Sequence, residues 1–139
     1  SKYLGKKVAK QDVKDLDLNL AKEIYKANYY KAPQIDRLPG AIQPQLFDMA
    51  VNHGPRNAIR MMQRVIKQAG ISNLVLDGVN GPNTFAAAES AQAQMGGYFN
   101  NAIVDERLNF YNALVARRPN QQVFLRGWTR RAETFRVAV

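Results

Sequence analysis

The sequence predicts an all-α fold, arranged as a compact domain with about six helices. Apolar residues recur at three- and four-residue spacing through nearly the whole chain, whereas the alternating pattern of a half-buried strand is scarce. Glycine and proline recur together between the periodic segments, as in NHGP and DGVNGP, where they end one helix and start the next. The 139 residues, of which 46% are hydrophobic, suffice for one domain with a single core.

The first helix is expected to begin near Asp17, whose side chain can accept backbone N–H bonds as an N-cap. It continues through AKEIYKANYY, with Leu20, Ile24 and Ala27 on one side. The next stretch, APQIDRLPGAIQP, contains three prolines and one glycine, which predict a loop. QLFDMAVN follows as a short, mostly apolar helix that we expect to be buried.

The helix after NHGP has the clearest pattern in the chain. Gly54 suits the left-handed backbone at the end of one helix, and Pro55 suits the first turn of the next. Gly70 is expected to end the helix that Pro55 begins. Its apolar stripe consists of residues at three- and four-residue spacing: Ala58, Ile59, Met62, Val65, Ile66 and Ala69.

Three further helices complete the prediction. The stretch DGVNGPNT, residues 77–84, makes a tight turn at Asp77-Gly78, and Pro82 then opens a helix through TFAAAESAQAQM. Gly96-Gly97 closes it. Two last helices are expected over NAIVDERLNFYNALVARR and VFLRGWTRRAETFR, separated by Pro119-Asn120.

The formal net charge is +9, from 20 lysines and arginines against 11 aspartates and glutamates. This excess predicts a polyanionic partner, whose binding weakens as salt screens the charges. Anionic lipid, bacterial envelope polymers and nucleic acid would all be attracted. No glycine-flanked aromatic motif or recognition-helix signature accompanies the charge, so we expect no nucleic acid.

The rare residue types exclude several classes of site. Cysteine is absent and His53 is the one histidine, which excludes disulfides, thiol nucleophiles and metal sites with several imidazoles. We therefore expect no metal and no cofactor. No apolar run approaches the roughly 20 residues of a membrane span, and the start, SKYLGKKVAKQDVKD, lacks the apolar stretch of a signal peptide. Because the chain begins without methionine, we expect a fragment or processed form. We also expect the protein to be a monomer.

Hydrolysis of a glycosidic bond normally takes two carboxyl groups that face each other across a cleft. Four glutamates lie inside predicted amphipathic helices, where we expect solvated surface positions: Glu23, Glu89, Glu106 and Glu133. Asp48 differs, because it lies in the apolar run LFDMAV, where a buried carboxylate needs partners. A structural hydrogen bond to a nearby loop is the favoured role for Asp48, ahead of catalysis.

Asn52 and His53 are candidates for the lining of a polar cleft. His53 has no serine or cysteine beside it to activate, so a nucleophilic triad gains no support. We expect its imidazole to interact with the negative end of the preceding helix, or to contact a bound ligand. The amide of Asn52 can donate and accept in the same turn.

Three aromatic residues are candidates for contact with sugar rings, whose apolar faces stack on aromatic side chains. Tyr29 and Tyr30 lie at the end of the first helix, and Trp128 lies in RGWTRR. Packing in the core is the structural alternative for each of them.

The succession DVKDL, AKEIYKANYY, DRLP, FDMAVNHGPRNAIRMMQ, DGVNGPNT and RGWTRR resembles the second part of the family-108 glycoside hydrolases. These phage endolysins and secretion-associated muramidases cut peptidoglycan. The match runs from about Val8 to Arg131. The resemblance implies a lysozyme-like helical fold. It also implies that residues 1–54 are the end of a glycoside-hydrolase-like region and that residues 55–139 form a peptidoglycan-binding region, packed together as one globular unit.

The chain also departs from these relatives. Their catalytic acid is a glutamate in an EGG-type motif near the amino terminus, followed by an aspartate and a glycine-rich stretch, and none of these occurs here. No residue of this chain inherits the catalytic role, Glu23 included. The resemblance therefore places the catalytic glutamate upstream of Ser1, and the 139 residues alone are expected to be inactive. The family usually has a small residue where His53 stands.

The resemblance implies an endolysin-type muramidase that binds peptidoglycan and acts at the bacterial cell wall after release from the host cytoplasm. Asp48, Asn52 and His53 would line its cleft, with Tyr29, Tyr30 and Trp128 as sugar platforms. Glycan contact at DGVNGPNT is a further alternative.

Two other functions remain open. One is a non-catalytic peptidoglycan-binding module. The other is a cationic envelope-disrupting antimicrobial protein, which would contact anionic lipid or lipopolysaccharide through its basic carboxyl-terminal face. The arginines of that face are Arg117, Arg118, Arg126, Arg130, Arg131 and Arg136.

Overall fold

The computed structural model describes the backbone of residues 10–139 and the side chains from Leu18 onward. Val8 and the start of the chain lie outside the described residues. The predicted all-α fold is confirmed, since every regular element within 10–139 is helical. Its six α-helices are α1 (Lys10–Lys26), α2 (Gln43–His53), α3 (Pro55–Gln68), α4 (Pro82–Met95), α5 (Gly97–Arg117) and α6 (Gln122–Glu133).

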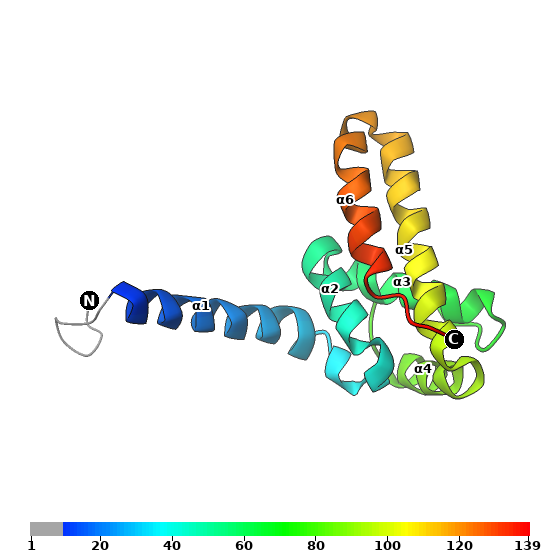
Figure 1. Ribbon diagram of the computed structural model, residues 1–139. Helices are drawn as coiled ribbons and strands as arrows, with labels where there is room; N and C mark the ends of the chain where they lie inside the picture. The colour runs from blue at the N-terminus through cyan, green and yellow to red at the C-terminus, as the bar shows by residue number, and fades with distance from the viewer. Residues whose placement is uncertain (1–9) are drawn as a thin grey trace.

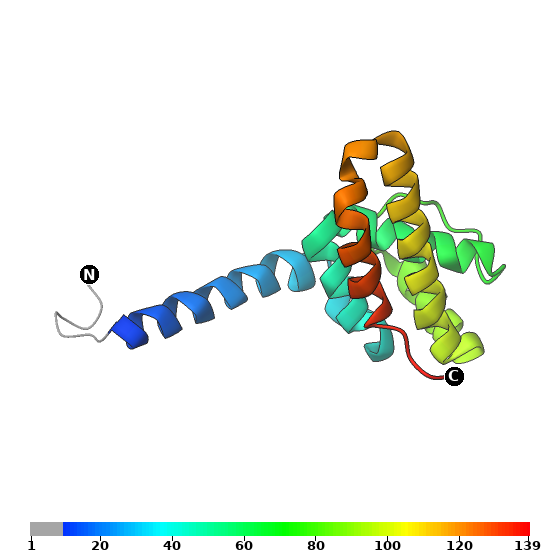
Figure 2. The same ribbon diagram turned by 45° about the horizontal axis from the view of Figure 1, so that its top comes forward.

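Helices α2 to α6 form the body of the molecule, and α1 projects from it as a single rod in both views (Figures 1 and 2). Helices α5 and α6 form an antiparallel hairpin that stands away from the body at its closed end. The chain after α6 runs back along the start of α5, where the Asn101 amide donates to the carbonyl of Val137 at 2.8 Å. No helix in the described part of the chain is both long and apolar enough to cross a membrane.

Helix α1 begins at Lys10, so the prediction of a start near Asp17 is wrong: Asp17 lies inside the helix. The predicted apolar side of this helix does not pack on the body. Leu20 is 60% exposed and Ile24 is 51% exposed. Periodicity correctly predicted an amphipathic helix here, but it does not say whether a partner covers the apolar side.

The stretch 32–44, predicted as a loop, contributes to the core. It forms two short 3-10 turns, Ile35–Arg37 and Gly40–Ile42. Ile35 and Ile42 are fully buried. The prolines and the glycine exclude an α-helix before Gln43, as expected, and Pro44 lies in the first turn of α2. The isoleucine side chains of the stretch are nevertheless buried away from water.

Helix α3 is the central helix of the body, because it contacts α2, α4 and α5. Five residues of its predicted stripe are buried, and Ala69 is exposed because it lies just past the end of the helix. The predicted stop at Gly70 is confirmed by its φ of 77°. Met61 and Gln63, outside the stripe, are buried as well. A single predicted stripe underestimates the burial of a helix that has neighbours on several sides.

The glycine–proline junctions lie where the sequence predicts them. Gly54 has a φ of 89° and Pro55 is the first residue of α3. Pro82 is the first residue of α4, and Gly96 follows its last residue with a φ of 57°. Helix α5 begins at Gly97, earlier than predicted, so that Phe99 is helical and fully buried.

The predicted surface position of Glu106 is wrong. Its carboxylate is buried between α5 and α3 and accepts a hydrogen bond from Arg64 at 3.0 Å. The other three glutamates named above, Glu23, Glu89 and Glu133, are exposed as predicted. A positive partner from another helix makes this burial tolerable, and helical periodicity within α5 cannot reveal such a partner.

Candidate functional site

One side of α2 lines two adjoining hollows in the surface of the protein. The hollows share Phe47 and Val51, and we call them together the α2 groove. The first hollow, of about 490 Å³, is the more polar and is lined by Pro44, Phe47, Asp48, Val51, Asn52, Trp128, Arg131 and Phe135. The second, of about 610 Å³, is mostly apolar and is lined by Lys22, Tyr25, Lys26, Tyr30, Phe47 and Val51.

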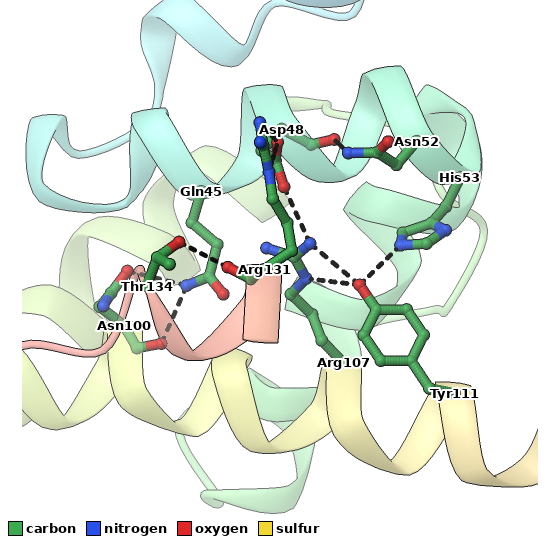
Figure 3. A network of polar contacts seen from close by, with 9 residues as sticks. All are labelled: Gln45, Asp48, Asn52, His53, Asn100, Arg107, Tyr111, Arg131 and Thr134. Atoms are coloured by element: carbon green, nitrogen blue, oxygen red, sulfur yellow. Dashed lines mark hydrogen bonds and ion pairs between the residues drawn. The ribbon is translucent and has the colours of Figure 1, made fainter. Parts of the chain in front are cut away.

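Asp48 anchors the polar hollow from the buried side of α2 (Figure 3). Its Oδ2 atom accepts a hydrogen bond from Arg107 Nη2 at 2.9 Å, and its Oδ1 atom accepts one from Arg131 Nε at 2.9 Å. Arg107 is fully buried. The expected need of Asp48 for partners is confirmed, but the partners come from α5 and α6 rather than from a nearby loop. The carboxylate therefore ties three helices together.

Tyr111 extends this network to His53. The Tyr111 hydroxyl accepts hydrogen bonds from Arg107 Nε at 3.1 Å and Nη2 at 2.9 Å, and it lies 2.9 Å from His53 Nε2. Burial, and then the positive charge of Arg107, lower the pKa of His53 to about 4. The imidazole is therefore neutral at pH 7. Because the Tyr111 hydroxyl already accepts two hydrogen bonds from Arg107, we assign its proton to the contact with His53 Nε2.

His53 consequently differs from its predicted surroundings. A neutral ring supplies no charge to the negative end of α2, so the predicted interaction with that helix end is wrong. His53 is half-buried and lines neither hollow of the α2 groove. Its ring instead packs against Phe110 and Tyr111, with centroid distances of 5.3 and 5.1 Å.

The three aromatic candidates take different positions. Trp128 lines the polar hollow and stacks on Phe124 at 5.8 Å between centroids. Tyr30 lines the apolar hollow, where its hydroxyl donates to the side-chain oxygen of Gln43 and its ring lies 5.5 Å from Phe47. Tyr29 packs against the main core and lines neither hollow. The structure thus brings four of the six predicted residues to one groove: Asp48, Asn52, Trp128 and Tyr30.

Eight residues that line the groove were not among the predicted site residues, and Phe47, Val51 and Arg131 are three of them. Phe47 and Val51 follow the same three- and four-residue spacing as Pro44, Asp48 and Asn52, so the sequence contains a signal that could have found them. Arg131 reaches Asp48 across 83 residues of sequence, and no local pattern signals that approach.

The turn at residues 77–84 borders a separate hollow of about 550 Å³. Gln63, fully buried on α3, organises the turn from below. Its amide donates to Asp77 Oδ1 at 3.0 Å, to the Val79 carbonyl at 3.1 Å and to Thr84 Oγ1 at 3.1 Å. Its carbonyl accepts from the Gly78 N–H at 2.9 Å. These bonds give the motif a structural role.

Asp77 itself is exposed. The N–H of Val79, and then the Gln63 amide, lower the pKa of its carboxyl. Within the described residues, no group of three or more histidine, cysteine, aspartate or glutamate side chains is placed to hold a metal ion.

Most of the chain matches known protein families. Residues 57–133 match the family described as "Predicted Peptidoglycan domain", and residues 1–54 match "Glycosyl hydrolase 108". The chain is similar to the solved "Structure of Brucella abortus SagA", with 30% identity and a TM-score of 0.69 over 96% of this chain and 70% of that one. No curated protein is significantly similar. The α2 groove draws on both matched segments: Asp48 belongs to the first, and Trp128 and Arg131 belong to the second.

Proposed function

Because the chain belongs to the peptidoglycan hydrolases that join a glycosyl hydrolase 108 segment to a predicted peptidoglycan domain, we propose that its α2 groove holds the glycan strand of peptidoglycan. The observation that carries this proposal is the convergence of four sequence-predicted residues on that groove. They come from α2, α6 and the π-helical segment Ala27–Lys31 that continues α1, and they meet where the two matched segments pack together.

The chemistry of the groove suits amino sugars. Trp128, Tyr30 and Phe47 offer aromatic surface to the apolar faces of sugar rings. The amide of Asn52 donates to the Asp48 carbonyl at 2.8 Å, which orients the side chain and leaves its own carbonyl oxygen to accept from a sugar hydroxyl or N-acetyl group. Such a mixture of apolar platforms and a few fixed polar groups is typical of small-molecule sites.

The carboxylate in the groove does not fit the role of catalytic acid. Both Asp48 oxygens accept hydrogen bonds from guanidinium groups, so the side chain acts as an acceptor that holds α5 and α6. We propose that the described chain forms the binding wall and that a glutamate outside these 139 residues protonates the leaving oxygen. The proposed place of action is the bacterial cell wall, where the substrate lies. Phage origin and bacteriolytic activity stay predictions.

Asn52 provides a matched test of the groove. Replacing Asn52 by Ala removes a groove amide, and we expect the affinity for soluble peptidoglycan fragments to fall about fivefold. Asn57→Ala is the control, because Asn57 also donates to the carbonyl four residues earlier at 2.8 Å but does not line the groove. Titration of labelled fragments measures both variants. Equal losses in the two variants would show that the groove is not the site.

A second assay tests whether this chain binds peptidoglycan while a segment outside it supplies the catalytic acid. The 139-residue chain should sediment with purified sacculi without releasing reducing sugar. Addition of an amino-terminal segment with a Glu-Gly-Gly motif should restore release. Hydrolysis by the 139 residues alone would contradict the proposal.

The end of the α5–α6 hairpin supports a second proposed partner, anionic envelope lipid. Val123 is 76% exposed and Phe124 is 50% exposed there. No acidic residue occurs between Glu106 and Glu133. Arg117, Arg118, Arg126 and Arg130 form no ion pair among the described residues. Apolar side chains among arginines are suited to the surface of an anionic bilayer.

Two of the six arginines predicted for the basic face are already paired. Arg131 binds Asp48, and Arg136 binds Asp105 at 2.8 Å and Glu133 at 2.7 Å.

Phe124→Ser removes an exposed apolar side chain from the end of the hairpin and should reduce sedimentation with phosphatidylglycerol vesicles about threefold. Val75→Ser, on the body, where the side chain is 75% exposed, should not.

A further inference from the structure

The α2 groove is strongly cationic for a site that would hold neutral sugars. Lys22 and Lys26 line its apolar hollow and Arg131 lines its polar hollow, whereas Asp48 is the single acidic lining residue. Glu23 lies next to Lys22 on α1 but lines neither hollow. The fully buried Arg107 adds a further positive charge beneath Asp48. The groove therefore has an excess of positive charge that Asp48 alone does not balance.

The cations of the groove are accessible. The side chain of Arg131 is 63% exposed, although it contacts Asp48. Both of its hydrogen bonds to Asp48 use Nε and Nη2, so its Nη1 group has no partner among the described residues. Lys22 and Lys26 are exposed and form no ion pair within that part of the chain. The polar hollow therefore offers an anion one guanidinium edge, and the adjoining apolar hollow carries two ammonium groups.

In peptidoglycan, the amino sugars of the strand are uncharged, and the carboxylates belong to the peptide stems. Neutral sugars offer arginine and lysine only hydroxyl and carbonyl oxygens as acceptors, whereas a carboxylate also carries the opposite charge and forms stronger hydrogen bonds with them. We infer that the α2 groove recognises glycan strands by the carboxylates of their attached peptide stems as well as by their sugars. This inference rests on the proposed function and specifies its ligand.

The groove divides naturally between the two parts of such a ligand. The aromatic side chains of Tyr30 and Phe47 lie in the apolar hollow and suit a sugar face. Arg131 lies in the polar hollow and suits a carboxylate. Lys22 and Lys26, on the exposed side of α1, would attract the stem from a distance.

The first experiment compares ligands with charged stems, with neutralised stems and without stems. Soluble muropeptide oligomers are titrated into the 139-residue chain before and after their stem carboxylates are converted to methylamides. Neutral oligomers of N-acetylglucosamine provide the third ligand. We expect at least tenfold tighter binding of the native oligomers, and a loss of that advantage as salt is raised.

The second experiment compares charge removal inside and outside the groove. Lys22→Gln together with Lys26→Gln should weaken binding of native oligomers about threefold, and Arg131→Gln about tenfold. Lys67→Gln and Arg130→Gln remove equal charges from exposed positions outside the groove, and they should leave binding unchanged. Far-UV circular dichroism checks that each variant is folded. None of the variants should change binding of the methylamidated oligomers.

The outcomes separate this inference from the proposed function. Equal affinity for native and methylamidated oligomers overturns the recognition of stem carboxylates and leaves glycan binding intact. Equal weakening by groove and control substitutions also overturns it, because the effect would then come from the net charge of the protein. Absence of binding to all three ligands overturns the proposed function itself.

Discussion

Gly78 is the residue on which the turn at 77–84 depends most directly. Its φ is 74°, in the left-handed region that favours glycine. A Cβ atom built there would lie 2.5 Å from Arg56 Cγ and 2.6 Å from the Arg56 carbonyl oxygen. The turn therefore approaches α3 so closely that only glycine fits, which also allows the Gly78 N–H to reach Gln63.

Replacing Gly78 by Ala should lower the free energy of unfolding by about 2–3 kcal/mol, because strain and steric conflict add. Gly81→Ala is the control: its φ is −120° and no atom lies within 4 Å of the added Cβ. We expect a change below about 0.5 kcal/mol there. Urea denaturation of the two variants measures the difference, and similar values would contradict the close approach.

His53 predicts a dependence of stability on pH. Its pKa is about 4 in the folded protein against 6.5 for the free side chain, so the unfolded chain binds more protons between these values. The stabilising contribution is complete above pH 6.5 and is lost as pH falls toward 4. Because the ring is partly solvated, we expect a loss of about 1 kcal/mol between pH 7 and pH 5.

His53→Gln should remove most of this pH dependence, because glutamine does not titrate and can still accept from Tyr111. Urea titrations at pH 7 and pH 5 test it. A variant that loses as much stability on acidification as the native chain would show that other groups are responsible.

At the scale of elements, the Asp48 network joins helices that are distant in sequence. Asp48 on α2 meets Arg107 on α5 and Arg131 on α6. A second small core of Val104, Tyr111 and Ala132 packs α5 against α6 beside it. The hairpin is therefore held to the body by a buried ionic contact in addition to apolar packing.

Asp48→Asn should lower the free energy of unfolding by about 2–4 kcal/mol, because it leaves the buried charge of Arg107 without its partner. Arg107→Gln should lower it by less, because Asp48 keeps its contact with Arg131. The double variant should be more stable than the sum of the two effects predicts, by about 1–2 kcal/mol. Denaturation of all four proteins gives this coupling energy. A coupling near zero would mean that the contact at 2.9 Å contributes little.

At the scale of the whole molecule, the two segments that match different families share one body. Helix α2 of the first segment packs on α3 of the second. The main core includes Leu46 and Met49 from the first, and Met62 and Ile103 from the second. Helix α1, in contrast, leaves its apolar side exposed.

This arrangement predicts a single cooperative unfolding transition. Far-UV circular dichroism, which reports all helices, and the fluorescence of Trp128 should give the same midpoint in urea. Ile24→Gln should shift that midpoint very little, with a change below about 0.5 kcal/mol, because Ile24 is 51% exposed. Two separate transitions would show that the segments fold independently.

Much of the fold could be predicted because its signals are local. Three- and four-residue spacing predicts a helix without knowledge of its neighbours, and glycine and proline determine the backbone at their own positions. The sequence therefore determined the all-α fold, the junctions at Gly54-Pro55 and Gly81-Pro82, and the need of Asp48 for partners.

The tertiary structure alone decided which residues meet. Arg131 reaches Asp48 across 83 residues, Arg64 accounts for the burial of Glu106, and burial beside Arg107 makes His53 neutral. Only the tertiary arrangement of α2, α6 and the segment Ala27–Lys31 combines Tyr30, Asn52 and Trp128 in one groove. Charge pairing and desolvation act between groups that are close in space. The spacing of residues in the sequence, in contrast, identifies only neighbours that are close along the chain.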